Sequence, residues 1–157
     1  MPPKIEEAIT AARVEDYLRA LTLFLDIYGS DDPPIRKPKD AVGLSFFGLT
    51  LAVMQKKFKP AIELCRRAIE LEFYNGDHYA NLARVYIAAG NRKKALETIG
   101  QGLKLVPEHE YLLNVRTSMG VRAKPAVPFL TRENPINVSL GQSRHAKKIA
   151  DQERKKR

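Results

Sequence analysis

Three- and four-residue steps separate the hydrophobic positions in the segment HYANLARVYIAAGNRKKALETIGQGLKLVP. Tyr79, Leu82 and Tyr86 therefore share one face of a predicted helix. A similar pattern follows the break at Gly90, and it ends before Pro107, which cannot continue a helix. The segment is predicted to form two helices joined by a tight turn.

The helical pair belongs to a repeating pattern. Ala61 and Cys65 lie 34 positions before Ala95 and Ile99, so they occupy equivalent places in an earlier pair of helices. A third, weaker copy begins the chain. No alternation typical of strands occurs in this part of the sequence. We therefore predict an all-α domain of about three helix-turn-helix units over residues 1–120, which ends in a capping helix within EHEYLLNVRTSMG.

Small residues stand in these helices where a larger core residue is usual. They are expected where two helices cross closely, because a large side chain would push the helices apart. Each hairpin would then bury its apolar face against the next one. The positions are Gly48, Ala61, Ala83 and Ala95.

A helix-turn-helix repeat of this length resembles the tetratricopeptide repeat family. The unit at about 41–75 departs from the family pattern at Phe73, where proline is usual. The resemblance implies a stacked helical solenoid that binds a protein segment, with no catalysis and no cofactor. The best unit, residues 76–109, carries the family's signature at Tyr79, Leu82, Ala83, Tyr86, Gly90, Ala95, Ile99, Gly102 and Pro107.

The resemblance also implies a concave groove lined by the first helix of each unit. The corresponding positions are mostly apolar, and exposed apolar area usually marks an interaction site. The alternative is that Ile5, Ile9 and Val53 are packed by the neighbouring hairpin. The predicted groove positions are Ile5, Ile9, Phe46, Leu49, Val53, Asn81, Arg84 and Ile87.

One family function is not expected here. Many members hold the acidic carboxy-terminal peptides of chaperones through lysine, asparagine and arginine side chains at fixed places in the groove. The corresponding residues lack positive charge, and an aspartate there would repel a terminal carboxylate. They are Ile5, Ile9, Phe47, Asp77 and Asn81.

The positive charge lies mainly at the carboxy-terminal end. The net charge is +9, but residues 1–120 carry 17 Lys and Arg against 15 Asp and Glu, whereas residues 121–157 carry 10 against 3. Prolines in this end predict an extended arm, with a basic helix possible from Ser139 onward. The basic residues of the arm include Arg144, Lys147, Lys148, Arg154, Lys155, Lys156 and Arg157.

Three roles are open for this arm. It could be a solvated terminus, or its cations could contact the phosphates of nucleic acid or an anionic membrane, without specificity. Aromatic residues are not interleaved with its cations, so recognition by base stacking is not expected. Alternatively, its AVPFL segment could cover an apolar groove or exchange between subunits.

The sequence offers no pattern for catalysis or for a metal ion. Cys65 is the only cysteine and falls on a helix-core position, which favours a buried thiol over a nucleophile. The histidines, His78, His109 and His145, lie in different segments without partners at metal-ligand spacing. Phosphate-binding and hydrolase motifs are also missing. We therefore expect a protein that is not an enzyme and that has no cofactor.

The expected location is cytoplasmic. The longest apolar stretch, LSFFGLTLAVM, is well short of the ~20 residues that span a bilayer. The amino terminus contains acidic residues and no apolar run of the kind found in secretory signals. A single cysteine fits a reducing compartment.

The sequence therefore predicts a cytoplasmic adaptor or scaffold that binds a protein partner. One alternative is an accessory protein that contacts nucleic acid or an anionic membrane through its basic arm. A second alternative, supported only by size and repeat number, is a substrate chaperone of the secretion type. The identity of the partner and the oligomeric state are left open.

Overall fold

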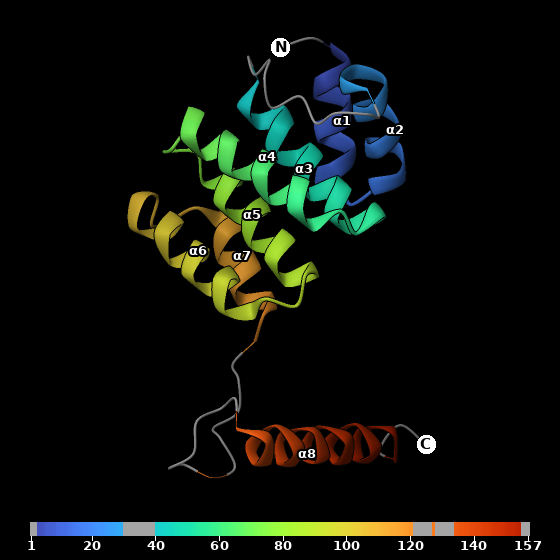
Figure 1. The fold of residues 1–157 in the computed structure, drawn as a ribbon, viewed down its shortest axis with the longest axis vertical. Helices are drawn as coiled ribbons and strands as arrows, with labels where there is room; N and C mark the ends of the chain where they lie inside the picture. The colour runs from blue at the N-terminus through green and yellow to red at the C-terminus, as the bar shows by residue number, and fades with distance from the viewer. Residues whose placement is uncertain (1–2, 30–39, 121–126, 128–133, 155–157) are drawn as a thin grey trace. The chain divides into compact units, whose positions relative to one another are not determined.

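The computed structural model describes residues 3–29, 40–120, 127 and 134–154, and all of their regular secondary structure is helical (Figure 1). This confirms the all-α prediction. The helices are α1 (Pro3–Arg13), α2 (Tyr17–Tyr28), α3 (Ala41–Gln55), α4 (Phe58–Leu71), α5 (Gly76–Ala88), α6 (Arg92–Leu105), α7 (Glu110–Ser118) and α8 (Pro135–Arg154).

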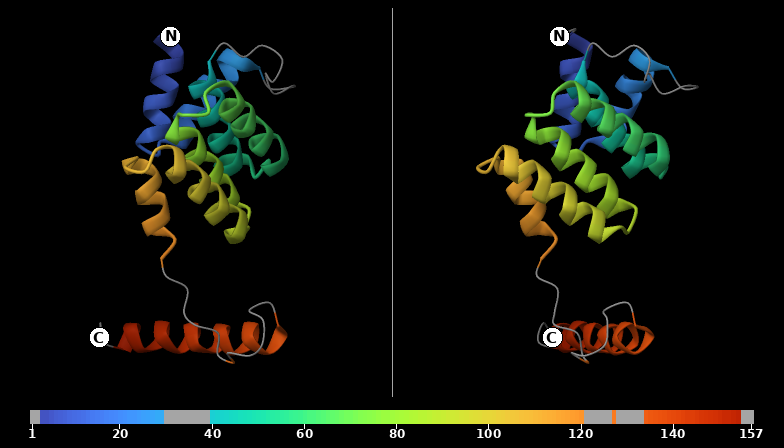
Figure 2. Two further views of the ribbon diagram at one scale, coloured as in Figure 1. Left: turned by 90° about the vertical axis from the view of Figure 1, so that its left-hand side faces the viewer. Right: turned by 60° about the vertical axis from the view of Figure 1, so that its left-hand side comes forward.

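The first seven helices form a stack of hairpins. Helix α1 packs on α2, α3 on α4, and α5 on α6, and the first helices of the hairpins also pack on one another, α1 on α3 and α3 on α5. Helix α7 closes the stack against α5 and α6, as Figure 2 shows from two further directions. The predicted solenoid of three hairpins and a capping helix is therefore confirmed.

Polar side chains fix the points at which several helices begin. The Asp16 carboxylate accepts a hydrogen bond from the backbone N–H of Arg19 at 3.2 Å, and Asp40 accepts one from Gly43 at 3.1 Å. Asn91 does the same for α6. Such N-caps satisfy backbone donors that the first turn of a helix leaves unpaired.

Helix α3 lies at the centre of the stack and is apolar on almost every side. It contacts α1, α2, α4 and α5, and most of its residues are buried. Among them are Phe47, whose ring lies 5.4 Å from that of Phe24, and Leu44. The run of apolar residues that was too short to span a membrane is thus the central core helix.

Two glycines in the helices lie at close contacts between neighbouring helices. A methyl group added at Gly48 would lie 2.8 Å from the carbonyl oxygen of Ala61 and 2.9 Å from the Cys65 sulfur. One added at Gly102 would lie 2.8 Å from Cβ of Tyr79. These distances confirm that small residues allow α3 to approach α4 and α5 to approach α6.

Contacts divide the chain into two compact units, Met1–Met119 and Gly120–Arg157. In the second unit, the basic helix that the sequence allowed from Ser139 onward is present as α8, but it starts at Pro135, so the extended geometry expected for the arm is wrong for residues 135–138. Proline is favoured in the first turn because its missing N–H would be unpaired there. The Asn137 side chain also holds the backbone of Val127, with contacts of 2.8 and 3.1 Å.

Two glycines of α6 allow a matched test of the helix contact. We expect Gly102→Ala to lower the free energy of unfolding by about 1–3 kcal/mol, because the added methyl group overpacks against Tyr79. Gly100 has no neighbour within 4 Å of such a methyl group. Gly100→Ala should therefore raise the free energy of unfolding by about 0.5–1 kcal/mol through helix propensity. Urea denaturation measures the free energy of unfolding of both variants. An equal increase in the two would contradict the close contact between Gly102 and Tyr79.

Candidate protein-interaction surfaces

Most of the predicted groove residues are buried in the stack. Phe46, Leu49 and Asn81 have no exposed surface, and Ile5 and Ile9 are each 7% exposed. Their assignment to an open groove is therefore wrong. The alternative, that the neighbouring hairpin packs them, holds for Ile5 and Ile9, which belong to the common hydrophobic core.

The reason for this burial is the close packing of the first helices. Because α1 packs against α3, positions that face a ligand in an open groove face the next helix instead. The Arg13 guanidinium also covers Phe46, at 5.0 Å from the centre of its ring. Arg13 in turn pairs with the Asp77 carboxylate of α5, and His109 Nε2 lies 3.4 Å from the same carboxylate.

A polar network closes the same face further along α5. The Asn81 side chain donates to the Ser45 hydroxyl at 2.7 Å and accepts from the Tyr111 hydroxyl at 3.2 Å. Arg84 donates to Tyr111 at 2.9 Å and forms an ion pair with Glu15 at 2.7 Å. Burial raises the pKa of Tyr111, which keeps its hydroxyl protonated as a donor. The network ties α5 to α3, to α7 and to the α1–α2 turn.

Three of the predicted groove residues remain at an open hollow. Val53, Arg84 and Ile87 line a pocket of about 460 Å³, and Ile87 is 39% exposed. This pocket is what the structure leaves of the predicted groove. Its other lining residues are Glu15, Ala88, Tyr111, Asn114, Val115 and Ser118.

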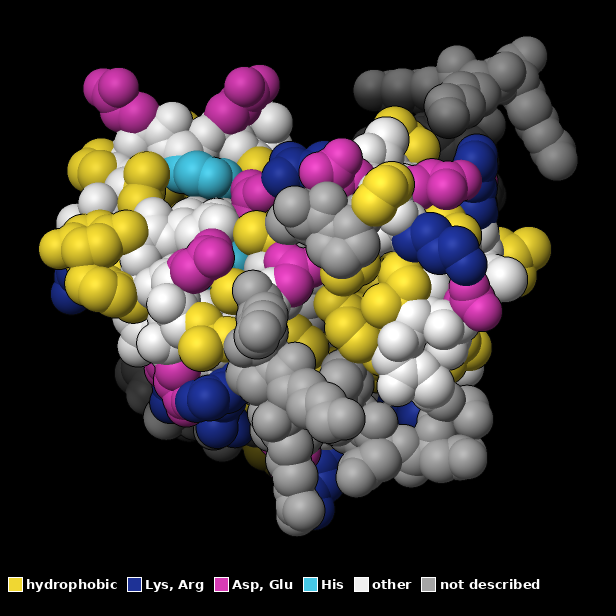
Figure 3. All heavy atoms as spheres, turned by 90° about the horizontal axis from the view of Figure 1, so that it is seen from above, with side chains coloured by type: hydrophobic (Ala, Val, Ile, Leu, Met, Phe, Trp, Pro, Cys, Tyr) yellow, Lys and Arg dark blue, Asp and Glu magenta, His cyan; other side chains and the backbone are white. Residues whose placement is uncertain are grey.

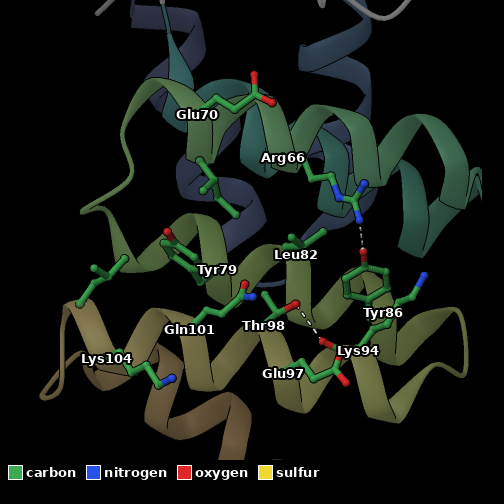
Figure 4. Close-up of a pocket in the computed structure, with 12 residues that line it drawn as sticks. Arg66, Glu70, Tyr79, Leu82, Tyr86, Lys94, Glu97, Thr98, Gln101 and Lys104 are labelled. Atoms are coloured by element: carbon green, nitrogen blue, oxygen red, sulfur yellow. Dashed lines mark hydrogen bonds between the residues drawn. The ribbon is translucent and has the colours of Figure 1, made fainter.

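A wider groove of about 750 Å³ lies between α4 and α6, with α5 as its floor (Figure 4). We call it the α4–α6 groove. Tyr79, Leu82 and Tyr86 form the floor, while Ile69 and Leu105 add apolar surface to the walls. Charged and polar side chains form the rest of the lining, namely Arg66, Glu70, Lys94, Glu97, Thr98, Gln101 and Lys104.

Sequence reasoning missed the α4–α6 groove. Its floor residues were recognised only as core positions of the repeat, and all three are indeed nearly buried. Core residues of one hairpin form this floor because the second helices of neighbouring hairpins stand apart above them. Helical periodicity could have indicated the outward positions of α4 and α6, but it does not give the distance between those helices.

An exposed aromatic pair lies on the turn between α4 and α5. The rings of Phe73 and Tyr74 are 4.0 Å apart, and the two residues are 51% and 66% exposed. With Leu71 and His109 they line a pocket of about 530 Å³. Figure 3 shows hydrophobic side chains gathered next to a histidine on this end of the stack.

The basic residues of the arm are described only in part. Arg144, Lys147 and Arg154 are exposed on α8. The side chain of Lys148 and residues 155–157, which are Lys155, Lys156 and Arg157, lie outside the described part of the structure.

The described residues show no arrangement for metal binding and no reactive thiol. They contain no group of three or more His, Cys, Asp or Glu side chains placed to hold a metal ion. Burial raises the pKa of the Cys65 thiol, which lies 3.5 Å from the Ser45 carbonyl oxygen. Within the described helices, none has the length and apolar character needed to cross a bilayer.

Comparison with known proteins supports the repeat architecture. Residues 52–118 match the family model of the tetratricopeptide repeat. The match begins in the last turn of α3 and runs through α4, α5 and α6 to the end of α7, so it includes the α4–α6 groove. No curated protein matches the chain.

Side-chain truncation can test the different burial of Phe46 and Ile87, two of the predicted groove residues. We expect Phe46→Ala to lower the free energy of unfolding by about 3–5 kcal/mol, because it leaves a cavity in the core. Ile87→Ala removes a partly exposed side chain and should change it by less than about 1 kcal/mol. Thermal and urea unfolding followed by circular dichroism will show the difference, and a mild effect of Phe46→Ala would restore this residue to an open groove.

Proposed function

We propose that this chain, whose residues 52–118 are tetratricopeptide repeats, is a non-catalytic adaptor that binds a segment of a partner protein in the α4–α6 groove. Tetratricopeptide repeats generally mediate protein–protein interactions. The proposal moves the binding surface from the concave groove expected from the sequence to the outer side of the hairpins.

The shape and lining of the α4–α6 groove carry the proposal. Its volume of about 750 Å³ falls in the range of about 300–1,000 Å³ that is usual for binding pockets. An apolar floor with a polar rim is also the usual anatomy of a protein interface. The pocket lined by Val53, Arg84 and Ile87 is smaller, and Arg84 within it already pairs with Glu15 and donates a hydrogen bond to Tyr111.

Catalysis is no part of the proposed function. The repeats are typically interaction modules, and Cys65, the only cysteine, is buried at the contact of α3 and α4. A lone cysteine fits a reducing compartment, which supports a cytoplasmic location for the adaptor.

A bulky residue in the groove tests the adaptor proposal. Gln101 points from α6 into the groove, so Gln101→Trp should fill it and weaken partner binding by at least about tenfold. Lys93→Trp places the same side chain on the same helix at an exposed position outside the groove lining, and it should bind as the wild type does. Proteins captured from the source cells by the three full-length chains are compared first.

Direct binding then decides the matter. Each protein that the wild type and Lys93→Trp capture, but Gln101→Trp does not, is purified and titrated by isothermal calorimetry against all three chains. If every purified partner binds Gln101→Trp with wild-type affinity, the α4–α6 groove is not the adaptor surface.

A second function is supported by the arm. Arg144, Lys147 and Arg154 stand exposed on α8, and we propose that they contact the phosphates of nucleic acid without sequence preference. Such contacts release counterions, so affinity depends steeply on salt concentration. Anionic lipid would engage the same cations and is the competing outcome.

Salt dependence measures the proposed phosphate contacts. We expect the affinity of the full chain for a DNA duplex to fall steeply from about 50 to about 200 mM salt, with each contact adding about 0.9 to the slope. Arg144→Gln, Lys147→Gln and Arg154→Gln together should flatten that slope. The control removes the same charge near the α3–α4 turn, through Lys56→Gln, Lys57→Gln and Lys59→Gln. An unchanged slope in the α8 variant, or binding only to anionic vesicles, would refute this role.

A further inference from the structure

At one end of the α4–α6 groove, two cations lie against a single tyrosine. Arg66 Nη2 on α4 donates a hydrogen bond to the Tyr86 hydroxyl at 3.2 Å. Lys94 Nζ on α6 lies 5.7 Å from the centre of the same ring. Figure 4 shows both side chains directed from opposite walls toward Tyr86 on the floor.

Neither cation is neutralised by a carboxylate in the described structure. The ion pairs formed by the described residues include Arg13, Arg19 and Arg84, but not Arg66 or Lys94. The neighbouring Glu70 is instead paired with Arg67, at 2.9 Å. Two like charges near one ring repel each other, and an anion placed between them would relieve that repulsion.

The Tyr86 hydroxyl adds a third donor at this place. Its oxygen accepts the hydrogen bond from Arg66, and within the described residues its own proton has no acceptor. A phenol can donate and accept at the same time. The guanidinium of Arg66, the ammonium of Lys94 and the Tyr86 O–H are therefore all donors available to one bound group.

We infer that Arg66, Lys94 and Tyr86 form a carboxylate-binding site, which takes an Asp or Glu side chain of the partner segment while apolar residues of that segment cover the rest of the floor. The inference rests on the proposed adaptor function and specifies the chemistry of its partner. Charge-assisted hydrogen bonds to a carboxylate are stronger and shorter than neutral ones, so this contact would fix the position of the segment.

The overall charge of the groove favours a carboxylate over a phosphate group. Its lining contains three cations, Arg66, Lys94 and Lys104, and two carboxylates, Glu70 and Glu97. The balance of one positive charge suits a singly charged ligand. A carboxylate would leave the lining and the ligand together without net charge, whereas a phosphate dianion would leave one unbalanced negative charge beside Glu97.

Selected peptides provide a defined probe. A phage-displayed library of random linear peptides, which have no free carboxyl terminus, is selected on the full chain, and binders that Gln101→Trp fails to retain are synthesised with amidated ends. We expect these peptides to share an acidic residue near apolar ones. Changing that residue to Gln should weaken binding by about tenfold or more, as measured by fluorescence anisotropy.

A double-mutant cycle assigns the carboxylate to the site. The double variant Arg66→Gln, Lys94→Gln should weaken binding of the acidic peptide by a similar factor. In that variant, the change to Gln in the peptide should then have little further effect on binding. Tyr86→Phe should weaken it by a smaller factor. Lys59→Gln with Lys93→Gln removes the same net charge from exposed residues of α4 and α6 outside the groove lining, and it should leave binding within about twofold.

The outcomes separate the two proposals. If peptide binding is weakened by Gln101→Trp but not by Arg66→Gln with Lys94→Gln, the adaptor groove stands and the carboxylate site is refuted. Equal weakening by the Lys59 and Lys93 control would also refute it, because the effect would be general charge attraction. Stronger binding of a phosphoserine peptide than of the Glu peptide would refute the carboxylate assignment. If no selected peptide depends on Gln101, both proposals fail.

Discussion

The contact between α5 and α6 at Gly102 is a constraint on which the outer surface of the stack depends. Because Gly102 has no side chain, α6 approaches the backbone end of Tyr79, and this approach sets the height of α6 above α5. Gly48 plays the same part between α3 and α4. The two second helices are thus held at fixed positions on either side of α5, and the α4–α6 groove is the space that remains between them.

The same tight stacking closes the inner face. Phe46 and Leu49 fill the space between the first helices, so a surface that is expected to bind a ligand serves as core. Arg13 and Arg84 then tie α1 and the α1–α2 turn to α5 through Asp77 and Glu15. The stack has an inner face formed by the first helices of the hairpins and an outer face formed by the second helices. In this chain the larger groove lies on the outer face.

Four cations of the stack that lie against aromatic side chains fall into two groups by their surroundings. Arg13 and Arg84 have carboxylate partners, and each also lies over an aromatic ring, which fits a role in holding helices together. Arg66 and Lys94 also lie against an aromatic residue, but no described carboxylate pairs with them. This difference, rather than the number of basic residues, distinguishes the proposed ligand site from structural ion pairs.

The sequence by itself determined the helices, the repeat, the small residues at helix contacts and the basic arm, because each of these follows from spacing or composition along the chain. It did not determine that Phe46 is covered, that α8 begins at Pro135, or that Arg66 and Lys94 meet at Tyr86. Periodicity shows which residues share a face of a helix. Which neighbour covers that face, and at what distance, is decided only when the helices pack.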